Sequence, residues 1–303
     1  MISSLRLATW LTIFLGGIFR LDLRTAEPPP LPSKPFLWKI EGRKPSYLFG
    51  TLHIPDKRVT TLPARVTQCL ESSDAVYIEV DPSDPQSSAA MQTMMLPPDQ
   101  SLSSILPADL QKRLQAYLRS RNVFALAFDG MKVWAAAINV RHLDHEALPE
   151  AGEPMDRVIL QYARLKRKET GGLETALEQC AAFDSLSTEE QVQYLRLTIE
   201  ALETQPEHPD EKAINLYLAG DSAALAAQLH ADLHSESPVT RKLTQRLVVE
   251  RDSRIADRIE AKLKAHPQKS HFFAIGAAHL GEKDGVVGLL VRKGFTITRL
   301  SEP

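Results

Sequence analysis

The stretch SYLFGTLHIPDKRV, residues 46–59, begins with an apolar run typical of a buried strand and places His53 three positions after a glycine. A second stretch, HFFAIGAAHLGE at residues 271–282, repeats this arrangement and ends it at His279. In α/β folds, ligands and metals are usually held by side chains just past the carboxyl ends of strands. The repeated Gly-x-x-His pattern therefore indicates either one site shared by two strand ends or two structural turn histidines.

Strand-like runs lie at both ends of the chain, and helical spacing dominates between them. The runs rich in β-branched and aromatic residues are FLWKI (36–40), SYLFG (46–50), AVYIEVD (75–81), HFFAIG (271–276) and FTITRL (295–300). From about residue 101 to residue 265 the apolar residues recur mainly at helical intervals. We therefore expect a mixed α/β fold in which strands from both ends form the core around a largely helical middle region.

The N-terminal segment differs in composition from the rest. Residues 7–19 carry no charge and lie between Arg6 and Arg20. A bilayer span needs about 20 apolar residues, so this run fits the apolar region of a secretory signal peptide better. We expect residues 1–26 to be a signal peptide or N-terminal anchor, 27–35 a proline-rich linker and 36–303 the folded domain. The chain is then exported: periplasmic, secreted, or membrane-attached through residues 7–19 of an uncleaved leader.

Charge and motif content argue against several classes of function. The 36 basic residues nearly balance the 38 acidic ones, so no nucleic-acid partner is expected. The chain contains no Walker motif, GxGxxG or G-x-S-x-G, which leaves nucleotide binding and nucleophile-elbow chemistry without support. Cys69 and Cys180 are the only cysteines. They could form a disulfide or remain two thiols, and without a C-x-x-C pair they do not predict a zinc site.

Glu79 and Arg251 are the further candidates for chemistry. Glu79 lies inside the apolar run VYIEVD, so its carboxylate faces a cleft, is paired with a cation, or is a strand-edge carboxylate satisfied by backbone or an arginine. Beside two imidazoles it would supply an oxygen ligand to a metal or act as a general base. Arg251 lies in VVERDSRIADRIEAKL together with Arg254 and Arg258. On this pattern alone a solvated helix face is the favoured interpretation, and the functional alternatives are that Arg251 stabilises an oxyanion or orients a carboxylate.

These segments resemble the TraB/PrgY/GumN family, and within it the Tiki-type metalloproteases. The likeness covers nearly all of residues 36–299 and is carried by PSYLFGTLHIPDKRV, LESSDAVYIEVDPSDP, GLETALEQC, ERDSRIADRIEAKL and HFFAIGAAHLGEKDGVVGLLVRKGFTI. It implies a divalent cation, with Mn²⁺ or Co²⁺ favoured, held by His53, Glu79 and His279 beside Arg251. It also implies a fold related to erythromycin esterases (EreA) and ChaN-like haem-binding proteins. The chain departs from the family at Asp252, where asparagine is common.

The resulting prediction is a divalent-metal-dependent hydrolase, specifically a metallopeptidase that acts on a peptide or an exported protein. Water activated by the cation would attack a carbonyl. Glu79 would be a ligand or the general base, and Arg251 would stabilise the tetrahedral oxyanion. The alternatives are a non-catalytic protein that binds a peptide, a pheromone or haem, and a metal-independent EreA-like esterase with His53 as the base. The sequence predicts neither the substrate nor the oligomeric state.

Overall fold

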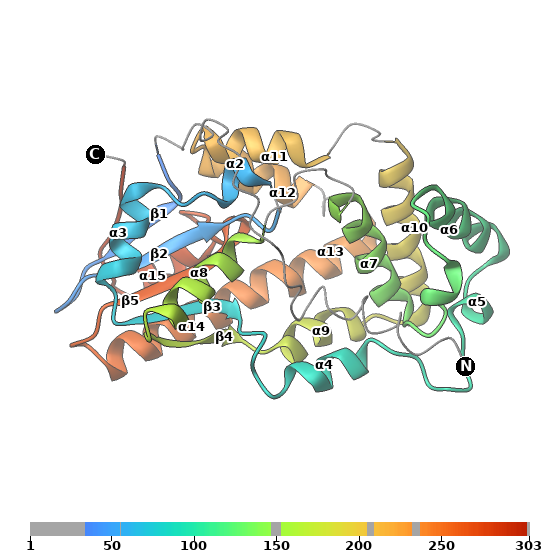
Figure 1. Ribbon diagram of the computed structural model, residues 1–303, viewed down its shortest axis with the longest axis horizontal. Helices are drawn as coiled ribbons and strands as arrows, with labels where there is room; N and C mark the ends of the chain where they lie inside the picture. The colour runs from blue at the N-terminus through green and yellow to red at the C-terminus, as the bar shows by residue number, and fades with distance from the viewer. Residues whose placement is uncertain (1–33, 55, 147–152, 205–208, 232–236, 302–303) are drawn as a thin grey trace.

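Six strands form one sheet in the computed structural model, which describes residues 34–54, 56–146, 153–204, 209–231 and 237–301 (Figure 1). Their order across the sheet is β4-β3-β5-β2-β1-β6. Strands β4, β3, β5 and β2 are parallel, whereas β1 runs antiparallel to both β2 and β6. The strands are β1 Leu37–Ile40, β2 Ser46–Thr51, β3 Ala75–Val80, β4 Glu169–Glu174, β5 His271–Gly276 and β6 Ile297–Arg299.

The central parallel strands are buried almost completely. Every residue of β5 is buried, and so is nearly every residue of its neighbours β2 and β3. Apolar runs without alternation are expected for parallel strands that are covered on both faces. The register pairs Thr51 of β2 with Gly276 of β5, and Ile78 of β3 with Ala274 of β5. The carboxyl ends of these three strands therefore meet at one edge of the sheet.

The helices cover the sheet and also form a second, all-helical region (Figure 1). Helix α8 packs on β3, β4 and β5, α14 contacts β4, and α3 contacts β2. Helices α5, α6, α7 and α10 lie at the opposite end of the molecule from β1 and β2 (Figure 1). The helices are α2 Lys57–Thr60, α3 Ala64–Ser72, α4 Ser87–Thr93, α5 Leu102–Ile105, α6 Ala108–Ser120, α7 Val133–Glu146, α8 Met155–Leu165, α9 Ala176–Asp184, α10 Thr188–Thr204, α11 Pro209–Leu218, α12 Ser222–Ala231, α13 Pro238–Thr244, α14 Glu250–Ala265 and α15 Val286–Arg292.

The hydrophobic interior is divided between these two regions. Around the sheet, Phe49, Phe272 and Phe273 are fully buried and belong to one core cluster. A separate cluster in the helical region includes Leu110 and Leu195. The cluster around the sheet contains residues of β2, β3 and β5. The positions of the carboxyl ends of these strands therefore depend on packing in that cluster.

The mixed α/β class and the strands at both ends of the chain are confirmed. The middle region is largely helical as predicted, but it also contains β4, which pairs in parallel with β3. Its sequence, ETGGLE, has two glycines and three charged or polar positions, so it shows no strand-like run. Pairing with an already formed edge, rather than local propensity, makes this segment a strand.

Three further expectations from the sequence concern the leader and linker, a membrane-spanning segment and the two cysteines. The leader, residues 1–26, lies outside the described residues, as does all of the linker except residues 34 and 35. The division into leader, linker and domain therefore stays a prediction. Within the described residues, no helix has the length and apolar character needed to cross a membrane. Cys69 in α3 and Cys180 in α9 do not form a disulfide.

We expect His271, at the start of β5, to make folding sensitive to acid. Its side chain is fully buried, stacks on Phe273 with ring centroids 5.7 Å apart, and has Nδ1 3.4 Å from the Ser46 hydroxyl. Burial lowers the pKa of His271 below its usual value of 6.5. In that pH range the unfolded chain binds the proton more readily, so the free energy of unfolding decreases as pH falls below about 6.5. Urea titrations at pH 7 and pH 5 should therefore show a smaller acid loss for His271→Phe than for the wild type.

His142, an exposed histidine of α7, offers the matched control, because His142→Gln should retain the acid loss of the wild type. An acid loss in His271→Phe as large as that of the wild type would contradict the assignment.

Candidate active site

The four residues singled out in the sequence meet at the carboxyl edge of the parallel strands. His53 follows the end of β2, Glu79 is the penultimate residue of β3, and His279 closes the short 3-10 turn Ala277–His279 after β5. Glu79 Oε1 lies 3.7 Å from His53 Nε2 and 4.0 Å from His279 Nε2. Arg251, from α14, reaches the other oxygen of the same carboxylate. One carboxylate therefore contacts both imidazoles and the guanidinium.

The two glycines of the repeated motif allow close packing for different reasons. A Cβ on Gly50 would lie within 2.8 Å of Leu280 and Phe36 side chains, so this glycine allows packing of the core. A Cβ on Gly276 would lie 2.9 Å from Glu79 Oε1 and 3.3 Å from His53 Nε2. The Gly276 N–H itself donates to Glu79 Oε1 at 2.5 Å. The absence of a side chain at Gly276 thus lets backbone, carboxylate and imidazole come together.

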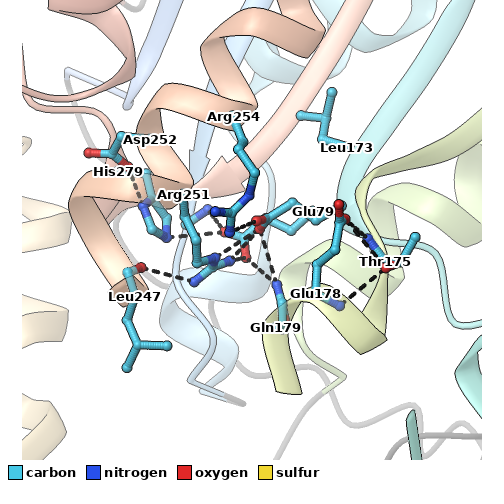
Figure 2. Close-up of polar contacts among 12 residues, drawn as sticks. Glu79, Leu173, Thr175, Glu178, Gln179, Leu247, Arg251, Asp252, Arg254 and His279 are labelled. Atoms are coloured by element: carbon cyan, nitrogen blue, oxygen red, sulfur yellow. Dashed lines mark hydrogen bonds and ion pairs between the residues drawn. The ribbon is translucent and has the colours of Figure 1, made fainter. Parts of the chain in front are cut away.

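Glu79 is a buried charge that is neutralised by Arg251. Both side chains are 10% exposed, and Arg251 Nη2 donates to Glu79 Oε2 at 2.7 Å (Figure 2). Arg251 Nε also donates to Oε2 of Glu174, whose side chain is fully buried at the end of β4. Burial by itself would raise the pKa of Glu79, but Arg251, His53 and His279 outweigh it and hold that pKa well below its usual range. Glu79 is therefore ionised in the folded chain.

Local structure explains how Arg251 and its neighbours reach this edge. The π-helical turn Gln245–Val249 immediately precedes α14, and the Leu247 carbonyl accepts from Arg251 Nη1 at 3.3 Å (Figure 2). Such turns occur frequently at functional sites. On the other side, Thr175 and Glu178 form a capping box that begins α9 directly after β4. This start places Gln179 with its Nε2 3.3 Å from Glu79 Oε2.

Each histidine has a carboxylate at its Nδ1 atom. Asp156 Oδ2 lies 2.8 Å from His53 Nδ1. Asp252 Oδ1 lies 2.5 Å from His279 Nδ1, as Figure 2 shows. The charge of Asp156 raises the pKa of His53 well above 6.5 despite the opposing effect of desolvation. The His53 side chain is 55% exposed, whereas that of His279 is 8% exposed. The site therefore opens to solvent on the side of His53.

The donor atoms fit a divalent cation in chemical type more closely than in spacing. Two imidazole Nε2 atoms and a carboxylate oxygen are the donor set of many catalytic metal centres. Two ligands of a tetrahedral ion lie about 3.4 Å apart when each bond is about 2.1 Å, a few tenths of an ångström less than the separations found here. As arranged, the described part of the chain holds no group of three or more His, Cys, Asp or Glu side chains with the spacing needed to hold a metal ion.

The sequence thus singled out residues that the fold brings together, and it missed three that accompany them. His53, Glu79, Arg251 and His279 meet as described, while their roles stay predictions. Glu174 and Gln179 both lie in GLETALEQC, one of the segments on which the family resemblance rests, and that segment was the available signal. Asp156 had no comparable signal, because an acidic residue in the first turn of a helix is common.

With this geometry in view, comparison with known proteins identifies the class of the chain. The model of the TraB/PrgY/gumN family matches residues 36–299. The chain belongs to the TraB/PrgY/gumN family. No solved structure matches the chain, so a likeness to EreA or ChaN proteins stays a prediction.

Curated relatives are 26–29% identical to the chain in an aligned region that covers most of the chain. It is 28% identical to metalloprotease TIKI1 of Homo sapiens, over 86% of this chain and 61% of that protein. It is 29% identical to metalloprotease TIKI2 of Xenopus tropicalis, over 86% of this chain and 59% of that protein. The metalloprotease TIKI homolog of Nematostella vectensis is 26% identical over 86% of this chain and 66% of its own length. The chain spans about three fifths of the length of the curated relatives it matches.

The close approach at Gly276 predicts that Gly276→Ala destabilises the fold. The added methyl group would displace Glu79 or His53, and overpacking of this kind costs about 1–3 kcal/mol. Chemical unfolding monitored by circular dichroism measures the change. Gly171→Ala on β4 is the control, because its Cβ would lie 3.4 Å from the Tyr77 ring, an ordinary contact. Equal stabilities of the two variants would show that the approach at Gly276 is not restrictive.

The buried charge pair predicts a large effect of Arg251→Met. This change leaves Glu79 and Glu174 buried without their shared cation, and breaking a buried ion pair from one side costs about 3–5 kcal/mol. Arg254→Met, one turn further along α14, serves as the control. Arg254 is 36% exposed and lies 3.4 Å from Glu174, so we expect a loss of about 1 kcal/mol or less. Denaturant midpoints that fall by the same amount in both variants would argue against a central role of Arg251.

Proposed function

We propose that this chain is a divalent-metal-dependent hydrolase and, more narrowly, a metallopeptidase that acts on a peptide or an exported protein. The observation that supports this most is the convergence of His53 Nε2, His279 Nε2 and Glu79 Oε1 at the ends of three neighbouring strands. The names of the curated relatives, all metalloproteases, agree with it.

In this proposal His53, His279 and Glu79 hold the cation, and Mn²⁺ or Co²⁺ is the ion that the family resemblance favours. A bound divalent cation supplies Lewis acidity, which polarises a carbonyl and lowers the pKa of water. Binding requires neutral imidazoles, so His53, whose pKa is raised by Asp156, must release its proton when the ion binds. Only three protein ligands are assigned, which leaves room for water and substrate.

The remaining side chains have separate roles in the proposal. Arg251 keeps Glu79 ionised and holds its Oε2, so that Oε1 faces the imidazoles. Glu79 Oε1 is then available as a ligand or as the base that accepts a proton from the attacking water. Within the described residues, Arg251 Nη1 donates only to the Leu247 carbonyl. Arg251 Nη1 carries a second N–H, and we assign this group to the developing oxyanion of the tetrahedral intermediate.

A peptide or protein substrate is part of the proposal, because the curated relatives are named metalloproteases. Because His53 is the exposed member of the site and His279 the buried one, substrate would approach over His53. Export, through residues 1–26 as a cleaved signal peptide or as an anchor, is part of the proposal and is supported by the uncharged run of residues 7–19 between Arg6 and Arg20.

Metal binding by the purified full chain is the decisive test. We expect about one Mn²⁺ or Co²⁺ per chain by calorimetry and elemental analysis, and none above background in His53→Ala/His279→Ala. His266→Ala, at an exposed histidine outside the site, should bind like the wild type. A peptide-library screen with the loaded protein should then show cleavage that His279→Ala abolishes while its circular dichroism spectrum is unchanged.

If the wild type binds neither ion more tightly than the double variant, the metallopeptidase proposal fails. Ester hydrolysis without metal would then favour the EreA-like alternative. Binding of a peptide or haem without turnover would favour the non-catalytic one.

A further inference from the structure

We propose that Asp156 and Asp252 are paired positioning residues, each of which holds one site histidine by Nδ1 so that its Nε2 faces Glu79. This assignment rests on the metal site proposed above and adds two residues of this chain to it. Neither aspartate was assigned a role from the sequence.

Asp156 is itself held in place by the strand that leads to His53. Its Oδ1 accepts a hydrogen bond from Thr51 Oγ1 at 2.9 Å, and its Oδ2 lies 2.8 Å from His53 Nδ1. Thr51 is the last residue of β2, two positions before His53. Asp156 lies in the first turn of α8, whose neighbouring Met155 is fully buried against the sheet. The end of β2 and the start of α8 therefore fix this carboxylate together.

Asp252 reaches the second histidine from the helix that also carries Arg251. Its Oδ1 lies 2.5 Å from His279 Nδ1, and the two side chains are 5% and 8% exposed (Figure 2). Both Arg251 and Asp252 are buried in the first turn of α14. Successive residues of one helix thus orient Glu79, through the guanidinium, and His279, through the carboxylate.

The two pairs differ in their contact, but we assign them the same role. Asp252 Oδ1 and His279 Nδ1 have hydrogen-bond geometry. Asp156 Oδ2 and His53 Nδ1 form an ion pair at 2.8 Å, in which Oδ2 makes no hydrogen bond to the described residues. An imidazole presents a lone pair at Nε2 only when its proton is on Nδ1, and an acceptor at Nδ1 selects that tautomer. A carboxylate in this position also makes Nε2 a stronger donor to a metal. Plain ion pairs that only stabilise the fold would not need both Nε2 atoms to face one carboxylate oxygen. Here both do, at 3.7 and 4.0 Å from Glu79 Oε1.

The test compares Asp156→Asn, Asp156→Ala, Asp252→Asn and Asp252→Ala in the full chain. The first measurement is Mn²⁺ and Co²⁺ affinity by calorimetry. Loss of such a partner weakens metal binding by about 10- to 100-fold. The asparagine variants keep an acceptor oxygen but lose the charge, so we expect their metal affinity to fall by about 10-fold. We expect the affinity of the alanine variants to fall by about 100-fold. Asp257→Asn, at a 61% exposed position of α14, is the control and should bind like the wild type.

The second measurement needs no metal. Nitrogen NMR of the metal-free protein at alkaline pH reports the tautomer of each imidazole. We expect the Nδ1–H form at His53 and His279 in the wild type and in the asparagine variants. Each alanine variant should shift its own histidine toward the Nε2–H form and leave the other unchanged. If an alanine variant does not fold, the asparagine variant of that position still tests the effect of charge on affinity.

The two measurements separate the possible failures. Folded alanine variants with wild-type tautomers, or folded asparagine variants with wild-type affinity, would overturn the positioning role. If the wild type binds neither cation, the proposed function fails, and the tautomers alone then decide whether the aspartates orient the histidines.

Discussion

The buried negative charge of Glu79 is the constraint on which the rest of the site depends. A carboxylate with a 10% exposed side chain needs a partner of opposite charge, because water cannot solvate it. Arg251 provides that charge but is shared with Glu174, so β3, β4 and α14 are joined through one guanidinium. Three segments that are distant in the sequence must therefore be in place together before the charges balance.

Parallel pairing explains why the imidazoles meet at the same carboxylate. Strands β3, β5 and β2 are adjacent in the sheet. Glu79, His279 and His53 lie at or just beyond the carboxyl ends of these three strands. Gly276 allows the closest of these approaches, since its N–H rather than a side chain faces Glu79. The site thus follows from strand order and register, while the all-helical region has a core of its own.

Sequence reasoning succeeded where a residue broke its local pattern and failed where it did not. Glu79 interrupts an apolar run, and His53 and His279 follow two such runs, so all three were visible without a structure. For Arg251 the pattern alone favoured a solvated helix face, because two further arginines share its helix, and this was wrong: its side chain is buried against Glu79. Strand β4 was missed because ETGGLE owes its strand conformation to pairing with β3, and Glu174 was missed with it. Where a residue does not stand out from its local sequence pattern, its contacts are set by tertiary packing. A single sequence does not show that packing.

The π-helical turn before α14 is equivalent to a one-residue insertion in an otherwise continuous helix. Three α-helical turns span about 11 residues. An unbroken α-helix that buries positions 239, 240 and 243 would therefore bury positions 250, 251 and 254 three turns later. The residues actually buried in the first turns of α14 are one position later: Arg251, Asp252 and Ile255. The wide turn shifts the buried stripe by one residue, so the segment before it and the segment after it can face different neighbours.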